Sequence, residues 1–149
     1  MDKLAMTKTL LTALSKVEQF IAAIDTSILN LAQYSYQHFS DTQKTMEDII
    51  SSIQTKKFLR NLRAKTETLL DSAPPNFQRV LILTYVHQLS AGKIANIIKK
   101  TERTVFRHLS DGLKWFADRI DTVIDNYDFA CIMNDEAWLR NIYNRLLRE

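Results

Sequence analysis

The sequence predicts an all-α protein with a long helical hairpin at the N-terminus, a group of shorter helices in the middle and a helical extension at the C-terminus. Only two glycines and two prolines occur in 149 residues, so few positions are expected to interrupt a helix. Valine, isoleucine and tyrosine rarely alternate with polar residues, as they would in strands, whereas apolar residues often recur at spacings of three and four.

The first arm of the predicted hairpin is a long helix over about residues 4–39. Its apolar residues follow alternating spacings of four and three, which is a heptad pattern. They are Leu10, Leu14, Val17, Ile21, Ile24, Ile28 and Leu31. Packing of this helix on its neighbour in the same chain is favoured over a coiled-coil homodimer, because about three heptads are near the minimum for a coiled coil.

The second arm is expected to start at Ser40, since Ser40 and Gln43 match the capping box S-x-x-Q, and to end near Asp71. This arm carries a run of basic residues. They are Lys56, Lys57, Arg60, Arg63 and Lys65. We interpret the run as a solvated helix face, and the alternative is an auxiliary contact with phosphates.

Three shorter helices are predicted in the middle of the chain. Ala73-Pro74-Pro75 is the strongest break, and because proline is tolerated in the first turn of a helix, a third helix is expected from there to about His87. Ser90 is a good N-cap for a fourth helix over residues 91–98. Thr101 is a good N-cap for a fifth, whose apolar spacing continues as far as Tyr127.

A last amphipathic helix is expected over residues 135–148, with Trp138, Leu139 and Ile142 on its apolar side. The chain therefore divides, on sequence grounds, into a helical hairpin over residues 1–71, a second domain over residues 72–128 and a C-terminal amphipathic helix over residues 129–149.

The charge is distributed unevenly along the chain. The net charge is only +3 and the sequence pI is about 9.0. Residues 71–120, however, carry eight basic against four acidic side chains, which leaves +4, and residues 121–149 carry three basic against six acidic, which leaves −3. A basic middle beside an acidic tail favours an anionic partner for the middle.

The spacing around residues 91–109 is typical of a helix-turn-helix motif. Small Ala95 lets the second helix approach, Val105 follows ten residues later to close the corner, and Lys99 falls at the turn. The fifth helix then exposes its other face, where arginines can fork onto the O6 and N7 acceptors of guanine in the major groove. That face holds Glu102, Arg103, Phe106, Arg107 and Ser110.

The start of the fifth helix suits a phosphate. The hydroxyls of Thr101 and Thr104, with the N-terminal backbone N–H groups and the positive end of the helix, can hold one. Lys99 and Lys100 then lie beside the duplex backbone. The candidate DNA-binding residues are thus Lys99, Lys100, Thr101, Glu102, Arg103, Thr104, Phe106 and Arg107.

The stretch PPNFQRVLILTYVHQLSAGKIANIIKKTERTVFRHLSDGLKWFADRI resembles region 4 of sigma-70-type factors and is similar to phage ArpU/RinA-type transcriptional regulators. The resemblance covers about a third of the chain. The matching positions are Pro75, Arg79, Val80, Leu81, Tyr85, Leu89, Ser90, Ile94, Ala95, Thr101, Thr104, Val105, Arg107, His108 and Leu109. The resemblance implies promoter or operator recognition, with DNA contacts from Glu102, Arg103, Thr104, Phe106 and Arg107.

Some positions depart from the family pattern. Lys93 stands where a glutamate is usual, and Lys100 where an apolar residue is usual. Lys99 stands where glycine is usual, and a non-glycine residue in the left-handed region costs about 1 kcal/mol. Phe106 is unusual on a recognition face, and we expect it to pack on another part of the chain rather than touch a thymine methyl. Gly112 replaces a small alanine, which is consistent with close helix packing.

An enzyme is not expected. His38, His87 and His108 fall on three different predicted helices, and the sequence contains no glycine-rich phosphate loop, no H-E-x-x-H and no Cys/His ligand spacing. No cofactor or metal is therefore predicted. Cys131, the single cysteine, is expected to be a small apolar filler, and one cysteine without a signal peptide or an apolar membrane span favours a cytoplasmic location.

Together these observations predict a DNA-binding transcriptional regulator of bacterial or phage type, whose N-terminal hairpin supports the domain or mediates homodimerisation. The alternative is a helical protein-interaction module whose basic helix binds an acidic protein surface, for example on RNA polymerase.

Overall fold

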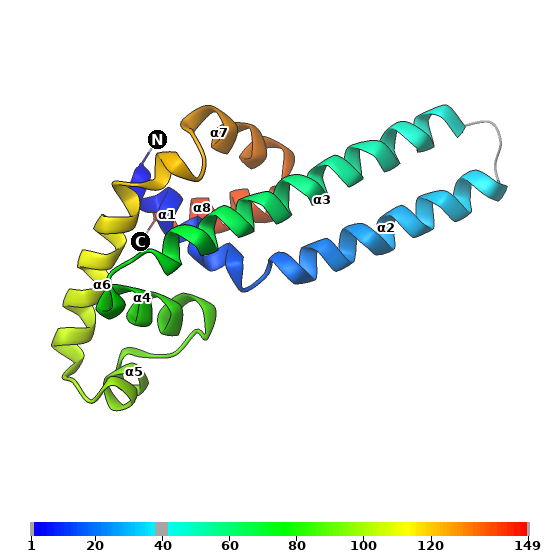
Figure 1. Ribbon diagram of the computed structural model, residues 1–149. Helices are drawn as coiled ribbons and strands as arrows, with labels where there is room; N and C mark the ends of the chain where they lie inside the picture. The colour runs from blue at the N-terminus through cyan, green and yellow to red at the C-terminus, as the bar shows by residue number, and fades with distance from the viewer. Residues whose placement is uncertain (1, 38–41, 149) are drawn as a thin grey trace. The chain divides into compact units, whose positions relative to one another are not determined.

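The computed structural model describes residues 2–37 and 42–148, which form helices and short connections without a strand (Figure 1). The all-α prediction is confirmed for this part of the chain. The elements are α1 (Lys3–Leu14), α2 (Val17–Gln37), α3 (Thr42–Asp71), α4 (Pro75–Leu81), the π-helical turn η2 (Ile82–Val86), α5 (Ala91–Ile98), α6 (Glu102–Ala117), the 3-10 helix η3 (Ile120–Thr122), α7 (Asn126–Asp135) and α8 (Ala137–Leu147).

The chain forms two compact units. One, the α2–α3 unit, is Lys16–Arg63, and the other, the main unit, combines Met1–Ser15 with Ala64–Glu149. This grouping does not coincide with the predicted boundaries at residues 71 and 128, because α1 and the end of α3 share their core with the later helices. None of the helices in the described ranges is both long and apolar enough to cross a membrane.

The predicted single helix over residues 4–39 is wrong, since it is interrupted at Ser15 and Lys16. The Ser15 hydroxyl donates to the carbonyl of Thr12 (2.9 Å), a local bond that competes with continued helix hydrogen bonding. The two pieces also bury their side chains differently. Helix α1 is buried on several faces, and its buried Thr7 and Thr9 hydroxyls donate to backbone carbonyls one turn earlier.

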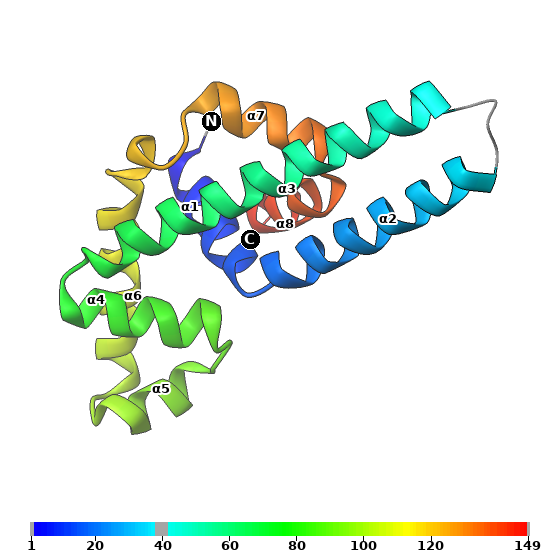
Figure 2. The same ribbon diagram turned by 45° about the vertical axis from the view of Figure 1, so that its right-hand side comes forward.

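Helices α2 and α3 lie side by side in the α2–α3 unit (Figures 1 and 2). Val17, Ile21 and Leu59 are buried there. Two ion pairs join the helices, Glu18 with Arg63 and Asp25 with Lys56. The basic run of α3 is therefore not a wholly solvated face, although Lys57, Arg60 and Lys65 are exposed. The predicted cap at Ser40 lies outside the described residues.

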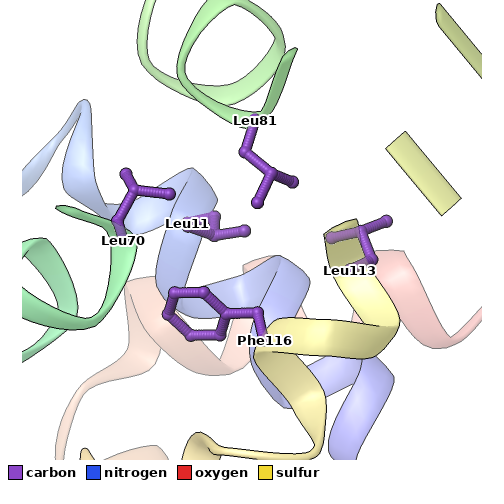
Figure 3. Packing of buried hydrophobic residues seen from close by; sticks show 5 residues of the cluster. All are labelled: Leu11, Leu70, Leu81, Leu113 and Phe116. Carbon is purple, nitrogen blue, oxygen red and sulfur yellow. The ribbon is translucent and has the colours of Figure 1, made fainter. Parts of the chain in front are cut away.

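The core of the main unit gathers leucines from four helices around one phenylalanine (Figure 3). The cluster is Leu11 from α1, Leu70 from α3, Leu81 from α4, and Leu113 and Phe116 from α6. None of these side chains is more than 6% exposed. Helix α1 also packs against α8, so the two ends of the chain's described part meet in this unit. Fixing α6 in this core determines which of its faces is left for function.

Close approach of α6 to α4 depends on Gly112. A β-carbon at residue 112 would lie 3.1 Å from Cβ of Phe77 and 3.4 Å from the Leu81 side chain. This contact agrees with the close packing predicted for Gly112. The rings of His108 and Phe77 also make a T-shaped contact, with ring centroids 6.3 Å apart.

Two predicted helix limits are corrected by the structure. The third helix does not stay α-helical to His87, because η2 forms a π-helical turn in which the His87 N–H donates to Ile82 (3.1 Å). The fifth helix ends at Ala117 instead of Tyr127. Asp125 begins the separate helix α7 by accepting from the Asp128 N–H (2.7 Å).

The C-terminal part contains a further correction. Cys131 is exposed rather than an apolar filler. It lies on α7, whose buried side is formed by Phe129, Ile132 and Met133. The last helix, α8, agrees with its predicted range within two residues and buries Leu139 and Ile142.

The two glycines of the chain should respond oppositely to substitution. Gly112→Val should lower the free energy of unfolding by about 1–3 kcal/mol, because a branched side chain has no room against Phe77 and Leu81. Gly92→Ala should raise it by about 0.5–1 kcal/mol, because the nearest atom to its β-carbon is the end of the flexible Glu102 side chain. Urea denaturation of both variants measures this, and a Gly112→Val protein as stable as the wild type would contradict the packing.

Candidate nucleic-acid interface

Helices α5 and α6 pack against each other at a corner within residues 91–109, and both predicted N-caps are present. The Ser90 side chain accepts from the Lys93 N–H (3.4 Å). The Thr101 side chain accepts from the Thr104 N–H (3.2 Å). Helix α5 has the predicted range, residues 91–98. The two caps set where each helix begins, and hence the length of the turn between them.

Lys99 occupies the left-handed region at the turn, with φ 58° and ψ 45°. The N–H groups of Lys99 and Lys100 both donate to the carbonyl of Ala95, the latter over 3.1 Å. This arrangement terminates α5 and reverses the chain direction. It also holds a lysine where glycine would be unstrained, so that two consecutive exposed lysines stand beside the start of α6.

The inside of the corner is apolar and buried, as predicted. Ile94 and Ala95 from α5 meet Val105 from α6, and Val80 from α4 completes the cluster. Ile98 and Leu109 pack against it. Val105 is 1% exposed, and its position fixes the rotation of α6 about its own axis.

The rotation set by Val105 leaves one side of α6 in solvent. Arg103, Phe106, Arg107 and Ser110 are all exposed, and their spacing of three and four places them on one face. Phe106 is 57% exposed, so the expectation that it packs on another part of the chain is wrong. Its neighbours on the face are arginines, whereas the apolar neighbours Val105 and Leu109 point to the α5 side.

Glu102 lies against α5, although the family pattern implied a DNA contact for it. Its Oε1 would be 3.1 Å from a β-carbon at Gly92, in the first turn of α5. A carboxylate is favourable near the positive end of a helix. Lys93 stands on α5 where the family has a glutamate, and Glu102 brings a carboxylate to this helix start from α6.

Thr101 and Thr104 form a small polar group at the start of α6. Their hydroxyl oxygens are 3.0 Å apart, and either one can donate. Thr101 is exposed and Thr104 is half-buried. The group leaves hydroxyl and backbone N–H donors close to Lys99 and Lys100, which is a donor set that suits an anionic oxygen.

Lys114 is a candidate residue that the sequence reasoning did not include. It is exposed, and it lies seven residues after Arg107 on the same face of α6. Two helical turns separate these residues, so the basic face runs about 16 Å from Arg103 to Lys114. The seven-residue spacing was visible in the sequence and could have identified it.

Other chemistry at this site is limited. His87 is exposed, and His108 is half-buried against Phe77. Within the described ranges, no three His, Cys, Asp or Glu side chains are grouped so that they could hold a metal ion.

Comparison of the chain with known protein families, with curated proteins and with solved structures gave no match.

Replacing Lys99 by glycine should stabilise the protein by about 0.5–1 kcal/mol, because glycine adopts the left-handed conformation without a steric cost. The matched control is Lys100→Gly, which removes the same charge at a neighbouring position without positive φ and should be neutral or destabilising. Thermal denaturation distinguishes the two variants. Equal changes in stability for the two variants would contradict backbone strain at Lys99.

Proposed function

We propose that this protein is a sequence-specific DNA-binding transcriptional regulator of bacterial or phage type, in which α6 enters the major groove. The observation that carries the proposal is the division of α6 into two faces. Val105, Leu113 and Phe116 are buried, whereas Arg103, Arg107 and Lys114 are exposed together on the opposite side. A helix that is fixed in a core and shows guanidinium groups from its first two turns suits base recognition.

The two kinds of basic residue have different proposed roles. Arg103 and Arg107 reach base edges, because a planar guanidinium can donate to guanine O6 and N7 at once. Lys99 and Lys100, at the turn, neutralise phosphates, together with the donors of Thr101 and Thr104. Lys114 extends the phosphate contacts along α6.

This assignment predicts different effects for two double variants on binding to a duplex selected from a random library. Arg103→Ala/Arg107→Ala should weaken binding to the selected duplex by roughly 10- to 100-fold, because base contacts are lost. Binding to a mixed-sequence duplex should be weakened much less. Lys99→Ala/Lys100→Ala should weaken binding to both duplexes by the same factor. It should also reduce the slope of log affinity against log salt concentration by about 1.8, since two phosphate contacts are lost. Fluorescence anisotropy across a salt series measures both.

The matched control for these variants is Arg145→Ala/Arg148→Ala, which removes two exposed arginine charges at the end of the main unit's last helix. Its affinity for both duplexes should stay within about twofold of the wild-type affinity, because only the small effect of net charge is changed. Equal losses in the control and in Arg103→Ala/Arg107→Ala would contradict a recognition role for α6.

Phe106 should read a thymine methyl, because it is exposed on α6 beside Arg103 and Arg107. Replacing single thymines of the selected duplex by uracil removes one methyl each. At one or two of the thymine positions, this replacement should lower the affinity of the wild type about fourfold, which is the factor expected for the loss of one buried methyl group. Phe106→Ala should bind both duplexes equally. Uracil effects that persist unchanged in Phe106→Ala would contradict the contact.

A second candidate function is a protein-interaction module, for example one that binds RNA polymerase. The observation that favours it is the apolar area on the corner, since Phe106 is 57% and Ile97 is 45% exposed. Large exposed apolar side chains occur at protein interfaces. Absence of DNA binding at low salt by the folded protein would favour this function over DNA recognition.

A further inference from the structure

One side of the α2–α3 unit exposes a group of large apolar side chains, here called the apolar patch. It consists of Leu29 (60% exposed) on α2 and Met46 (56%), Ile50 (52%) and Ile53 (51%) on α3. The three α3 residues follow spacings of four and three, so they form one stripe along the helix. The patch lies entirely within one compact unit.

The two ion pairs described in this unit indicate that Leu29 lies on the same edge of the α2–α3 contact as Ile53. Asp25 pairs with Lys56, and Glu18 pairs with Arg63, so both pairs mark the same edge of the α2–α3 contact. Leu29 follows Asp25 by one turn of α2, on that edge. Ile53 precedes Lys56 by about one turn of α3, at the same level along the antiparallel pair. Leu29 and the α3 stripe therefore flank the Asp25–Lys56 ion pair.

The charges around the patch are divided along α3. The half before the centre of the stripe carries the exposed Lys44, Glu47 and Asp48, which leaves −1, and the half after it carries the exposed Lys57 and Arg60. Two copies of α3 packed parallel would bring like charges together. Two copies packed antiparallel place each acidic half beside the basic half of the other copy, which is attractive in both places.

We propose that this protein forms a homodimer in which the apolar patches of two copies face each other and the two α3 helices run antiparallel about a two-fold axis. Such an interface is isologous, so each favourable contact occurs twice. Its centre is the Ile50–Ile53 segment. Glu47 of one protomer lies near Lys57 of its partner at each end.

A second copy fits the patch better than other apolar partners. An anionic membrane surface would attract Lys57 and Arg60 but repel Asp25, Glu47 and Asp48 around the same patch. An identical chain packed antiparallel brings Lys57 of one copy to Glu47 of the other at both ends of the patch. Because only four large side chains per protomer contribute, the dimer is of moderate strength, with a dissociation constant of roughly 1–100 µM.

This dimer differs from the coiled coil considered from the sequence. The heptad residues Val17 and Ile21 are buried within the protomer, whereas the apolar patch uses residues outside that heptad series. The inference stands apart from the proposed DNA recognition, since it concerns the α2–α3 unit and is tested without DNA.

Sedimentation velocity of the full chain, from about 1 µM to several hundred micromolar, tests the proposal. The wild type should shift from monomer to dimer over this range, and Ile50→Glu/Ile53→Glu should stay monomeric. The matched control is Ala23→Glu/Ser27→Glu, which adds two carboxylates at exposed positions on the side of α2 turned away from Leu29. The dissociation constant of the control dimer should be within about threefold of the wild-type value.

Circular dichroism establishes that Ile50→Glu/Ile53→Glu remains helical. Should that variant unfold, Ile50→Gln/Ile53→Gln replaces it, with the same expectation of at least tenfold weaker association. A wild type that is monomeric at several hundred micromolar overturns the proposal. So does a dimer that the substitutions at residues 50 and 53 do not weaken.

The antiparallel arrangement has its own test. Glu47→Lys and Lys57→Glu should each weaken the dimer by about 3- to 10-fold, because each places like charges together at both ends of the interface. In the double variant Glu47→Lys/Lys57→Glu, the dissociation constant of the dimer should return to within about twofold of the wild-type value. Additive weakening in the double variant overturns the antiparallel pairing.

Discussion

The packing of α6 on α4 is the interaction on which the main unit depends. Phe116 and Leu81 are completely buried in it, and Gly112 lets the two helices approach until a single β-carbon would crowd Phe77. Each fully buried leucine or phenylalanine contributes about 1.5–3 kcal/mol. Helix α1 and the end of α3 add Leu11 and Leu70 to the same cluster, so residues from the N-terminal helix and from the middle of the chain hold α6 in one orientation.

That orientation decides which residues of α6 can meet a partner. Leu113 and Phe116 hold the second half of the helix, and Val105 holds the first half against α5. The remaining face carries Arg103, Arg107 and Lys114 in solvent. The strained turn at Lys99 belongs to the same arrangement, because a small cost in conformational energy there places two lysines at the start of the helix.

Local hydrogen bonding explains why much of the corner could be predicted. Ser90 and Thr101 were identifiable as N-caps because a side-chain oxygen only has to reach an N–H three residues later. The approach of the two helices at Ala95 and Val105, both buried, was expected from the ten-residue spacing between them. The left-handed conformation of Lys99 agrees with its place at the turn, where the family pattern that the sequence resembles usually has glycine.

The features that sequence reasoning missed depend on contacts distant in the chain. Ile120, Val123 and Ile124 continue the apolar spacing of α6 and are buried, yet the backbone leaves the α-helix at Ala117 to reach the core by another path. The break at Ser15 is hidden within an unbroken heptad pattern. Exposure of Phe106 and Cys131 depends on which neighbours come near, and spacing carries no information about that.

The measurement that tests the account most directly is mapping of DNA contacts by NMR, from the backbone amide shifts of the labelled protein during titration with a duplex. The account predicts that the largest shifts fall between Lys99 and Lys114, on the turn and the exposed face of α6. It also predicts small shifts in α7 and α8. Shifts concentrated instead in the basic run of α3 or in α8, or no shifts at low salt, would contradict the role assigned to α6.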